Sequence, residues 1–106
     1  MAVIKKLHNV KVREAVLEAH LVKKVRAIGG IAEKAVYLTK AGAADRWCFL
    51  PGGRLYLVEV KTEHGRLSAQ QKIERDRMLA LGFDFNVVWS EAEIDALIER
   101  MKAEAQ

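Results

Sequence analysis

The pattern of hydrophobic and polar positions along the chain predicts a helix followed by a series of strands. From Val12 to Ile28, hydrophobic residues recur every three or four positions, and lysines and arginines occupy the other side. The positions that form this stripe are Ala15, Ala19, Val22 and Val25. Such spacing is typical of a helix with one buried face.

Gly29-Gly30 is expected to end this helix, and three stretches with the pattern of strands follow. Ile31 to Thr39 alternates, while Arg46 to Leu50 and Leu55 to Thr62 flank the turn sequence Pro51-Gly52-Gly53. The glycines predict a hairpin between the last two strands. The later strand opens with four hydrophobic residues in a row, so we expect it to lie in the centre of the sheet.

The rest of the chain predicts a helix, a strand and a helix. Ser68 and Gln71 fit a capping box at the start of a helix that runs to Leu81. Phe83 to Trp89 is a predicted strand, and Ser90 is the predicted cap of a final helix. Its hydrophobic stripe consists of Ile94, Leu97, Ile98 and Met101.

This order, one helix, three strands, a helix, a strand and a helix, indicates an α/β fold. Three consecutive strands and a helical crossover to a fourth predict a mixed four-stranded sheet flanked by helices. With 106 residues the chain has room for one hydrophobic core, so we expect a single domain over residues 1–106.

The net charge of +4 is modest, but the positive charge is clustered. The clustered residues are Lys5, Lys6, Lys11 and Arg13, and then Lys23, Lys24 and Arg26. A polyanionic partner such as DNA would fit this clustering, although on charge alone a solvated helix face is the better interpretation. Charge alone therefore does not decide the function.

Several kinds of site are disfavoured by composition. The single cysteine, Cys48, lies in a hydrophobic run, where a buried side chain is expected rather than a nucleophile or metal ligand. His8, His20 and His64 have no metal-ligand spacing and are expected to be structural or surface residues. The hydrophobic runs are too short for a signal peptide or a membrane span, so we expect a cytoplasmic protein.

The residues with the clearest chemistry are Asp45, before the predicted hairpin, and Glu59-Val60-Lys61 after it. Residues two apart in a strand point to the same face, so Glu59 and Lys61 should project side by side. The simpler interpretation is an exposed charged edge. It is disfavoured because this pair continues a run that is hydrophobic on both faces, where unpaired charges are costly.

Two carboxylates and a backbone carbonyl supply the oxygen ligands that Mg²⁺ or Mn²⁺ requires. Asp45, Glu59 and the carbonyl of Val60 are the predicted donors. A neighbouring ammonium can orient the attacking water or neutralise negative charge on a phosphate, and Lys61 is predicted to do so.

This pattern resembles the PD-(D/E)XK nuclease superfamily, and in detail its VRR-Nuc branch, the virus-type replication-repair nucleases. The resemblance runs from Glu14 to Trp89: a helix acid, a strand, Asp45, a hairpin, Glu-x-Lys, and a helix that opens with Leu-Ser-x-x-Gln. The family usually has proline before its metal-binding aspartate, where this chain has Ala44. That change should affect the stiffness of the loop more than the chemistry.

The resemblance implies a restriction-endonuclease-like core and a Mg²⁺- or Mn²⁺-dependent phosphodiesterase that cuts DNA. It also implies a homodimer that acts on branched DNA such as four-way (Holliday) junctions. The alternatives are a DNA-binding module that has the same fold but does not cut, and a small interaction protein whose basic face only keeps it soluble.

Five further residues are candidates for the site, and the resemblance supports Glu18 and Gln71 among them. Glu18 matches the helix acid and could bind the metal through a water, but an ion pair with a lysine remains an alternative. Gln71 matches the glutamine after the nuclease core, and a capping box explains it equally well. Lys34, Lys40 and Arg66 could contact phosphates, although solvated charges are the simpler interpretation.

The hairpin register decides whether Asp45 and Glu59 can act together. A two-residue turn at Gly52-Gly53 would pair Asp45 with Val60 and turn the aspartate away from Glu59. A three-residue loop with a bulge shifts the pairing by one and returns Asp45 to the face of Glu59. We therefore predict the longer loop or an equivalent bend.

Overall fold

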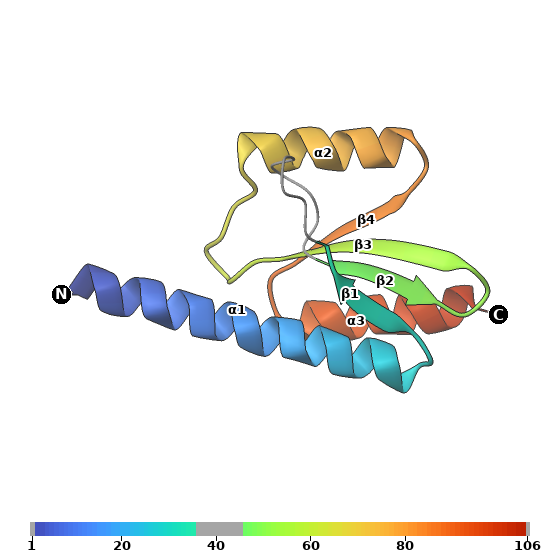
Figure 1. Ribbon diagram of the computed structural model, residues 1–106, viewed down its shortest axis with the longest axis horizontal. Coiled ribbons are helices and arrows are strands. Elements are labelled where there is room, and N and C mark those ends of the chain that lie inside the picture. The colour runs from blue at the N-terminus through green and yellow to red at the C-terminus, as the bar shows by residue number, and fades with distance from the viewer. Residues whose placement is uncertain (1, 36–45, 106) are drawn as a thin grey trace.

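A computed structural model describes the backbone of residues 2–35 and 46–105 and the side chains of residues 10–35 and 46–105. Its elements are α1 (Ala2–Ala27), β1 (Ile31–Lys34), β2 (Arg46–Leu50), β3 (Arg54–Val60), α2 (Ala69–Ala80), β4 (Asp84–Val88) and α3 (Glu91–Glu104) (Figure 1). The sheet order is β1-β2-β3-β4. β1 and β3 pair antiparallel with β2, while β4 is parallel to β3. The predicted mixed four-stranded sheet, with β3 between two neighbours, is confirmed.

The helices lie on both faces of the sheet: α2 on one, α1 and α3 on the other (Figure 1). Side chains along β3 alternate between these faces. Val58 and Val60 join the main hydrophobic core, which α1 and α3 also line. Leu57 and Glu59, the alternate positions, are buried but do not belong to that core. Glu59 therefore lies on the face that α2 covers.

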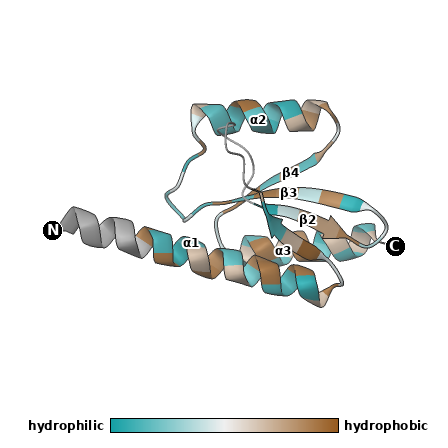
Figure 2. Ribbon diagram, viewed as in Figure 1, coloured by the Kyte–Doolittle hydropathy of each residue, from teal (hydrophilic) through white to brown (hydrophobic). Residues whose placement is uncertain are grey.

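Helix α1 differs from the prediction in its length and in its buried face. It begins at Ala2 rather than Val12, because the residues before Val12 include no glycine or proline to stop it. Hydrophilic and hydrophobic residues alternate along its described side chains (Figure 2).

The buried stripe of α1 consists of Leu17, Leu21 and Val25, whereas the predicted members Ala15 and Ala19 are exposed. The helix turns its larger side chains inward because burying leucine and valine removes more apolar area from water than burying alanine. The predicted stripe was therefore wrong at its alanines.

The hairpin has the predicted longer loop. Leu50 pairs with Arg54 across the three residues Pro51–Gly53, and Arg46 pairs with Val58. Gly52 and Gly53 have φ values of 84° and 74°, a conformation that glycine adopts without steric cost. β1 is described only to Lys34, and residues 36–39 of the predicted strand lie outside the described residues.

The helix caps formed as predicted. Ser68 and Gln71 form a complete capping box on α2, and the Ser90 hydroxyl accepts a hydrogen bond from the backbone N–H of Glu93 on α3. The α3 stripe of Ile94, Leu97, Ile98 and Met101 is buried. Cys48 is buried as expected, and burial raises the pKa of its thiol to about 12. Within residues 2–35 and 46–105, no helix combines the length and hydrophobicity needed to cross a membrane.

A polar network ties the starts of β3 and β4 to α3. The Arg100 guanidinium donates to both carboxylate oxygens of Asp84, at 2.7 and 2.9 Å, and to Glu104 at 3.2 Å. The Tyr56 hydroxyl donates to Glu104, and Arg54 donates to the Tyr56 hydroxyl. Hydrogen bonds from Arg100 hold the pKa of Asp84 below its usual value.

We expect Arg100→Ala to lower the melting temperature at pH 7 by about 4–8 °C. This corresponds to a loss of about 1 kcal/mol in the free energy of unfolding when the bidentate ion pair is removed. Because the pKa of Asp84 is lowered by folding, its contribution is present above its unfolded pKa of 3.8 and disappears as the pH falls through the folded value. The difference between Arg100→Ala and wild type should therefore narrow below about pH 4.

Calorimetric melting at pH 7 and pH 3 measures both effects. Lys102→Ala is a suitable control, because Lys102 pairs only with the exposed Glu99 on the same helix in the described contacts. A difference that stays constant between the two pH values would show that the Arg100–Asp84 pair is not its source.

Candidate active site

The Glu59 carboxylate is the centre of the candidate site. Its residue is 2% exposed. The side-chain amide Nε2 of Gln71 donates to Glu59 Oε1 at 2.7 Å, and Lys61 Nζ lies 3.5 Å from the same oxygen. A buried carboxylate needs such partners, because its desolvation is otherwise costly. The structure thus brings together three of the predicted site residues.

Gln71 fulfils both of the roles considered for it. Its Oε1 accepts a hydrogen bond from the Ser68 backbone N–H at 2.8 Å, which completes the capping box of α2. Its Nε2 donates to Glu59. The capping box and a place in the site were treated as alternatives from the sequence, but one amide group serves both.

The segment that follows Glu59 is held at the end of β4. The Lys61 backbone N–H donates to the Val88 carbonyl at 2.9 Å, which continues the parallel pairing beyond β3. The Trp89 indole Nε1 donates to the Gly65 carbonyl at 2.9 Å. A Cβ at Gly65 would lie 3.1 Å from the Thr62 carbonyl oxygen and 3.2 Å from Lys61 Cβ. The close turn at Gly65 therefore packs directly against Lys61.

Glu18 is half-buried on α1 and forms an ion pair. Arg46 Nε, from the first residue of β2, donates to Glu18 Oε1 at 3.2 Å, and Arg46 Nη1 donates to the Ala32 carbonyl. The predicted alternative to metal binding was an ion pair with a lysine, and the partner is an arginine. Glu18 approaches from the α1 side of the sheet, whereas Gln71 reaches Glu59 from the α2 side.

Known proteins with a similar sequence or structure point to one family. No family model matches the chain. The chain is 40% identical over 80 residues to "Putative nuclease p44" of Acyrthosiphon pisum secondary endosymbiont phage 1. The aligned region covers 76% of this chain and 86% of that protein. A solved structure described as "VRR_NUC domain" matches with a TM-score of 0.77 and 32% identity, covering 81% of this chain and 94% of that one.

The chain belongs to the VRR-Nuc family of nucleases. The mixed sheet, its flanking helices and the resemblance seen in the sequence agree with this assignment. Glu59, Lys61 and Gln71 are the members of the candidate site of this VRR-Nuc domain that the structure describes.

The remaining predicted site residues are exposed or lie outside the residues that the structure describes. Asp45 and Lys40 lie outside the described residues. Lys34 is exposed on β1, and Arg66 is exposed and donates to the Gly65 carbonyl of its own loop.

The histidines fit structural or surface positions where they are described. His20 Nε2 lies 2.7 Å from Asp95 Oδ1, so it links α1 to α3. His64 is exposed beside Glu63. The side chain of His8 lies outside the described part of the chain.

The described residues of the candidate site offer oxygen donors of the kind that a hard divalent cation requires. Among residues 10–35 and 46–105, no three acidic, histidine or cysteine side chains lie close enough to hold a metal. Glu59 offers carboxylate oxygen and Val60 a carbonyl, which are ligand types that Mg²⁺ and Mn²⁺ accept. The second carboxylate that the sequence predicts for this site, Asp45, lies outside the described residues.

Glu74 is a buried carboxylate that the sequence did not single out. Its residue is 7% exposed, one helical turn after Gln71 on α2, and its Oε2 lies 3.5 Å from Arg77 Nη1. The three-residue spacing from Gln71 was visible in the sequence. On a helix with many charged residues, however, this spacing alone does not predict whether a glutamate is buried or exposed.

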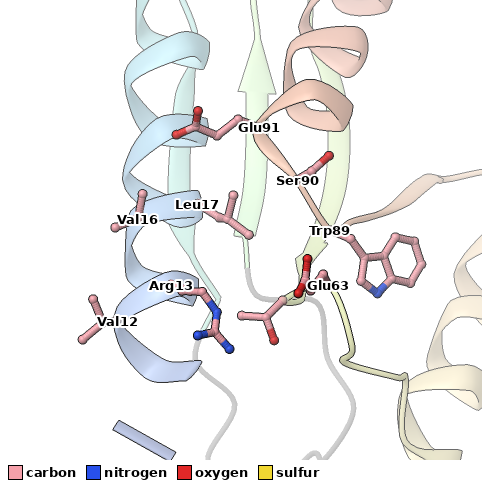
Figure 3. A pocket seen from close by; sticks show the side chains of 9 residues that line it. Val12, Arg13, Val16, Leu17, Glu63, Trp89, Ser90 and Glu91 are labelled. Carbon is pink, nitrogen blue, oxygen red and sulfur yellow. The ribbon is translucent and has the colours of Figure 1, made fainter. Parts of the chain in front are cut away.

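A cavity of about 590 Å³ lies between α1 and the segments that follow β3 and β4 (Figure 3). It is lined by Val12, Arg13, Val16, Leu17, Thr62, Glu63, Trp89, Ser90 and Glu91. Its charged lining consists of one arginine and two glutamates, so its charge does not favour a phosphate. The Trp89 side chain points away from Arg13 and α1 in Figure 3.

Proposed function

We propose that this VRR-Nuc nuclease is a Mg²⁺- or Mn²⁺-dependent DNA endonuclease that hydrolyses phosphodiester bonds and prefers branched DNA such as four-way junctions. The observation that carries the proposal is the buried Glu59 carboxylate, to which Gln71 donates at 2.7 Å with Lys61 at 3.5 Å. Structural ion pairs are common, but a buried acid with an adjacent lysine also suits metal-assisted hydrolysis.

Asp45, Glu59 and the Val60 carbonyl would hold the ion. Glu18 could contact it through a water only if it left its ion pair with Arg46 on the α1 side of the sheet. The support for Asp45 is its place in the sequence: it directly precedes Arg46, whose strand partner Val58 directly precedes Glu59. When bound, the ion lowers the pKa of a water molecule and offsets negative charge on the phosphate.

Lys61 is the residue that would contribute a positive charge to the reaction, in addition to the charge of the ion. Its side chain is 19% exposed, so the ammonium can reach solvent and substrate while it remains close to Glu59. It would orient the attacking water or neutralise charge that develops on the phosphate oxygens during in-line attack. No covalent intermediate is needed, because the nucleophile is water.

DNA binding is supported by the distribution of cations. Lys11, Arg13, Lys23 and Arg26 are exposed on α1, and Lys34 and Arg66 are exposed on β1 and on the loop after β3. Contacts of these side chains with phosphates would position the duplex without reading its sequence. Lys40 is included in this set from the sequence alone.

The homodimer belongs to the same proposal. Two sites related by a two-fold axis would suit cutting both strands of a junction symmetrically. The exposed hydrophobic residues Val12 and Val16 on α1 and Ile73 and Leu79 on α2 offer surfaces for association. Light scattering, with and without junction DNA, tests this part, and a monomeric mass in both samples would overturn it.

Cleavage assays test the enzyme directly. Single-stranded, duplex and four-way-junction DNA of matched length are incubated with the protein and Mg²⁺, Mn²⁺ or a chelator. We expect cutting only with metal, fastest on the junction. Metal-independent cutting would remove the ion from the mechanism, and equal rates on all three substrates would remove the structural preference.

The same samples separate the alternatives. A binding module would retain the DNA without cutting it. For a protein whose basic face only keeps it soluble, binding would be too weak to show the steep fall in affinity with salt that phosphate contacts produce.

A further inference from the structure

The orientation of the Gln71 side-chain amide is determined by two partners of opposite character. Ser68 offers a backbone N–H, which requires the oxygen of the amide, and Glu59 offers a carboxylate oxygen, which requires the nitrogen. Rotating the amide by 180° would place nitrogen against the N–H donor and oxygen against the carboxylate. The contact with Ser68 therefore forces the Nε2 group toward Glu59.

Ser68 holds Gln71 at a second point as well. The Ser68 hydroxyl accepts a hydrogen bond from the Gln71 backbone N–H at 3.1 Å. No hydrophobic residue of α2 is fully buried, and Ile73 and Leu79 are about half exposed. Ser68 thus contacts both the backbone and the side chain of Gln71 in the first turn of the helix.

We propose that Ser68 is a positioning residue of the nuclease site: it fixes the Gln71 amide so that Nε2 stays on the Glu59 carboxylate. Ser68 acts through Gln71 and does not touch the substrate. This inference rests on the proposed function, because the orientation of the Glu59 carboxylate affects cleavage only if Glu59 belongs to the nuclease site. A misplacement of about 1 Å at a reacting group can cost as much as a hundredfold in rate.

Two substitutions at one position isolate this contact. Ser68→Ala removes the hydroxyl but keeps the backbone N–H that donates to Gln71 Oε1. Ser68→Pro removes both, and its ring fits the backbone because Ser68 has a φ of −69°. The difference between the two variants therefore reports the N–H contact, with the loss of the hydroxyl cap common to both.

Ser90→Ala is the matched control for cap loss. In the wild-type protein the Ser90 hydroxyl accepts a hydrogen bond from the Glu93 backbone N–H on α3 at 3.1 Å. The corresponding hydrogen bond of Ser68 on α2 has the same length. Ser90→Ala and Ser68→Ala should lose similar thermal stability, while Ser90→Ala cleaves DNA at the wild-type rate.

We expect Ser68→Pro to cleave junction DNA at least tenfold more slowly than Ser68→Ala in single-turnover assays at saturating Mg²⁺, with DNA affinity unchanged. The second readout needs no activity: the Gln71 side-chain amide signals in ¹H–¹⁵N spectra of the DNA-free protein should move in Ser68→Pro and stay in Ser68→Ala. Equal cleavage by the two variants, or unchanged amide signals in Ser68→Pro, overturns the proposal.

If Ser68→Pro does not fold, Gln71→Glu takes its place. This variant keeps a capping box but cannot donate to Glu59. Wild-type cleavage by Gln71→Glu would overturn the positioning role, because the donation to Glu59 that Ser68 is proposed to secure would then be dispensable. Failure of the wild-type protein to cut any DNA would instead sink the proposed function, while the amide signals would still decide whether Ser68 orients Gln71.

Discussion

Replacing Glu59 by Gln is expected to abolish metal binding and to lower DNA cleavage by at least two orders of magnitude, while the protein still folds. The substitution keeps the volume of the side chain but removes a hard anionic ligand. The fold should survive, because the oxygen of the new amide can still accept the hydrogen bond that Gln71 donates at 2.7 Å. Mn²⁺ titration calorimetry, thermal melting and single-turnover cleavage measure the three quantities.

Glu74→Gln is the matched control for Glu59→Gln. Both glutamates are buried on the α2 side of the molecule, at 7% and 2% exposure, and the chemical change is the same. We expect Glu74→Gln to retain Mn²⁺ binding, so that a loss confined to Glu59→Gln cannot be a general effect of removing a buried charge.

Asp45→Asn extends the test to the second predicted ligand. It should reproduce the loss of Mn²⁺ binding and of cleavage, since both carboxylates are assigned to one ion. Undiminished Mn²⁺ affinity in both Asp45→Asn and Glu59→Gln would remove the assignment of these residues as metal ligands.

The elements of the fold were predictable because local signals and burial agree in most of them. The run from Arg46 to Leu50 pairs as expected, and Ser68 and Ser90 cap the helices that their side chains predict. The two glycines of the hairpin also decided its register, since a three-residue loop returns the pairing that places Val58 opposite Arg46. Each of these signals acts over a few residues.

The buried face of α1 was harder to predict because two stripes are possible on the same helix. Ala15 and Ala19 share a three- or four-residue spacing with Val22, yet Leu17 and Leu21 are buried instead. Periodicity identifies a helix, but the choice of face depends on which side chains fill the space above the sheet.

Within the site, the shared face of Glu59 and Lys61 follows from the two-residue period of a strand. The contact of Gln71 with Glu59 does not, because it depends on where α2 crosses the sheet. The Glu18–Arg46 pair and the Trp89–Gly65 hydrogen bond join residues 28 and 24 positions apart. Only the tertiary structure brings such partners together.

Lys61→Ala separates catalysis from binding and from stability. Lys61 Nζ lies 3.5 Å from Glu59 Oε1, too long for a strong hydrogen bond, and Gln71 remains as a donor when the ammonium is removed. The melting temperature should therefore fall by only a few degrees. We expect the variant to bind Mn²⁺ and junction DNA while cleavage falls by two or more orders of magnitude, the approximate effect of losing one electrostatic stabiliser.

Lys61→Arg and Lys72→Ala complete the Lys61 experiment. Arginine keeps the charge but spreads it over a planar group, so it should rescue cleavage poorly if a compact ammonium beside Glu59 is what the reaction needs. Lys72 is an exposed lysine on α2, and Lys72→Ala should cleave at the wild-type rate. Single-turnover cleavage and thermal melting of the three variants decide the matter: collapse of the fold in Lys61→Ala makes the lysine structural, and near-normal cleavage removes it from the mechanism.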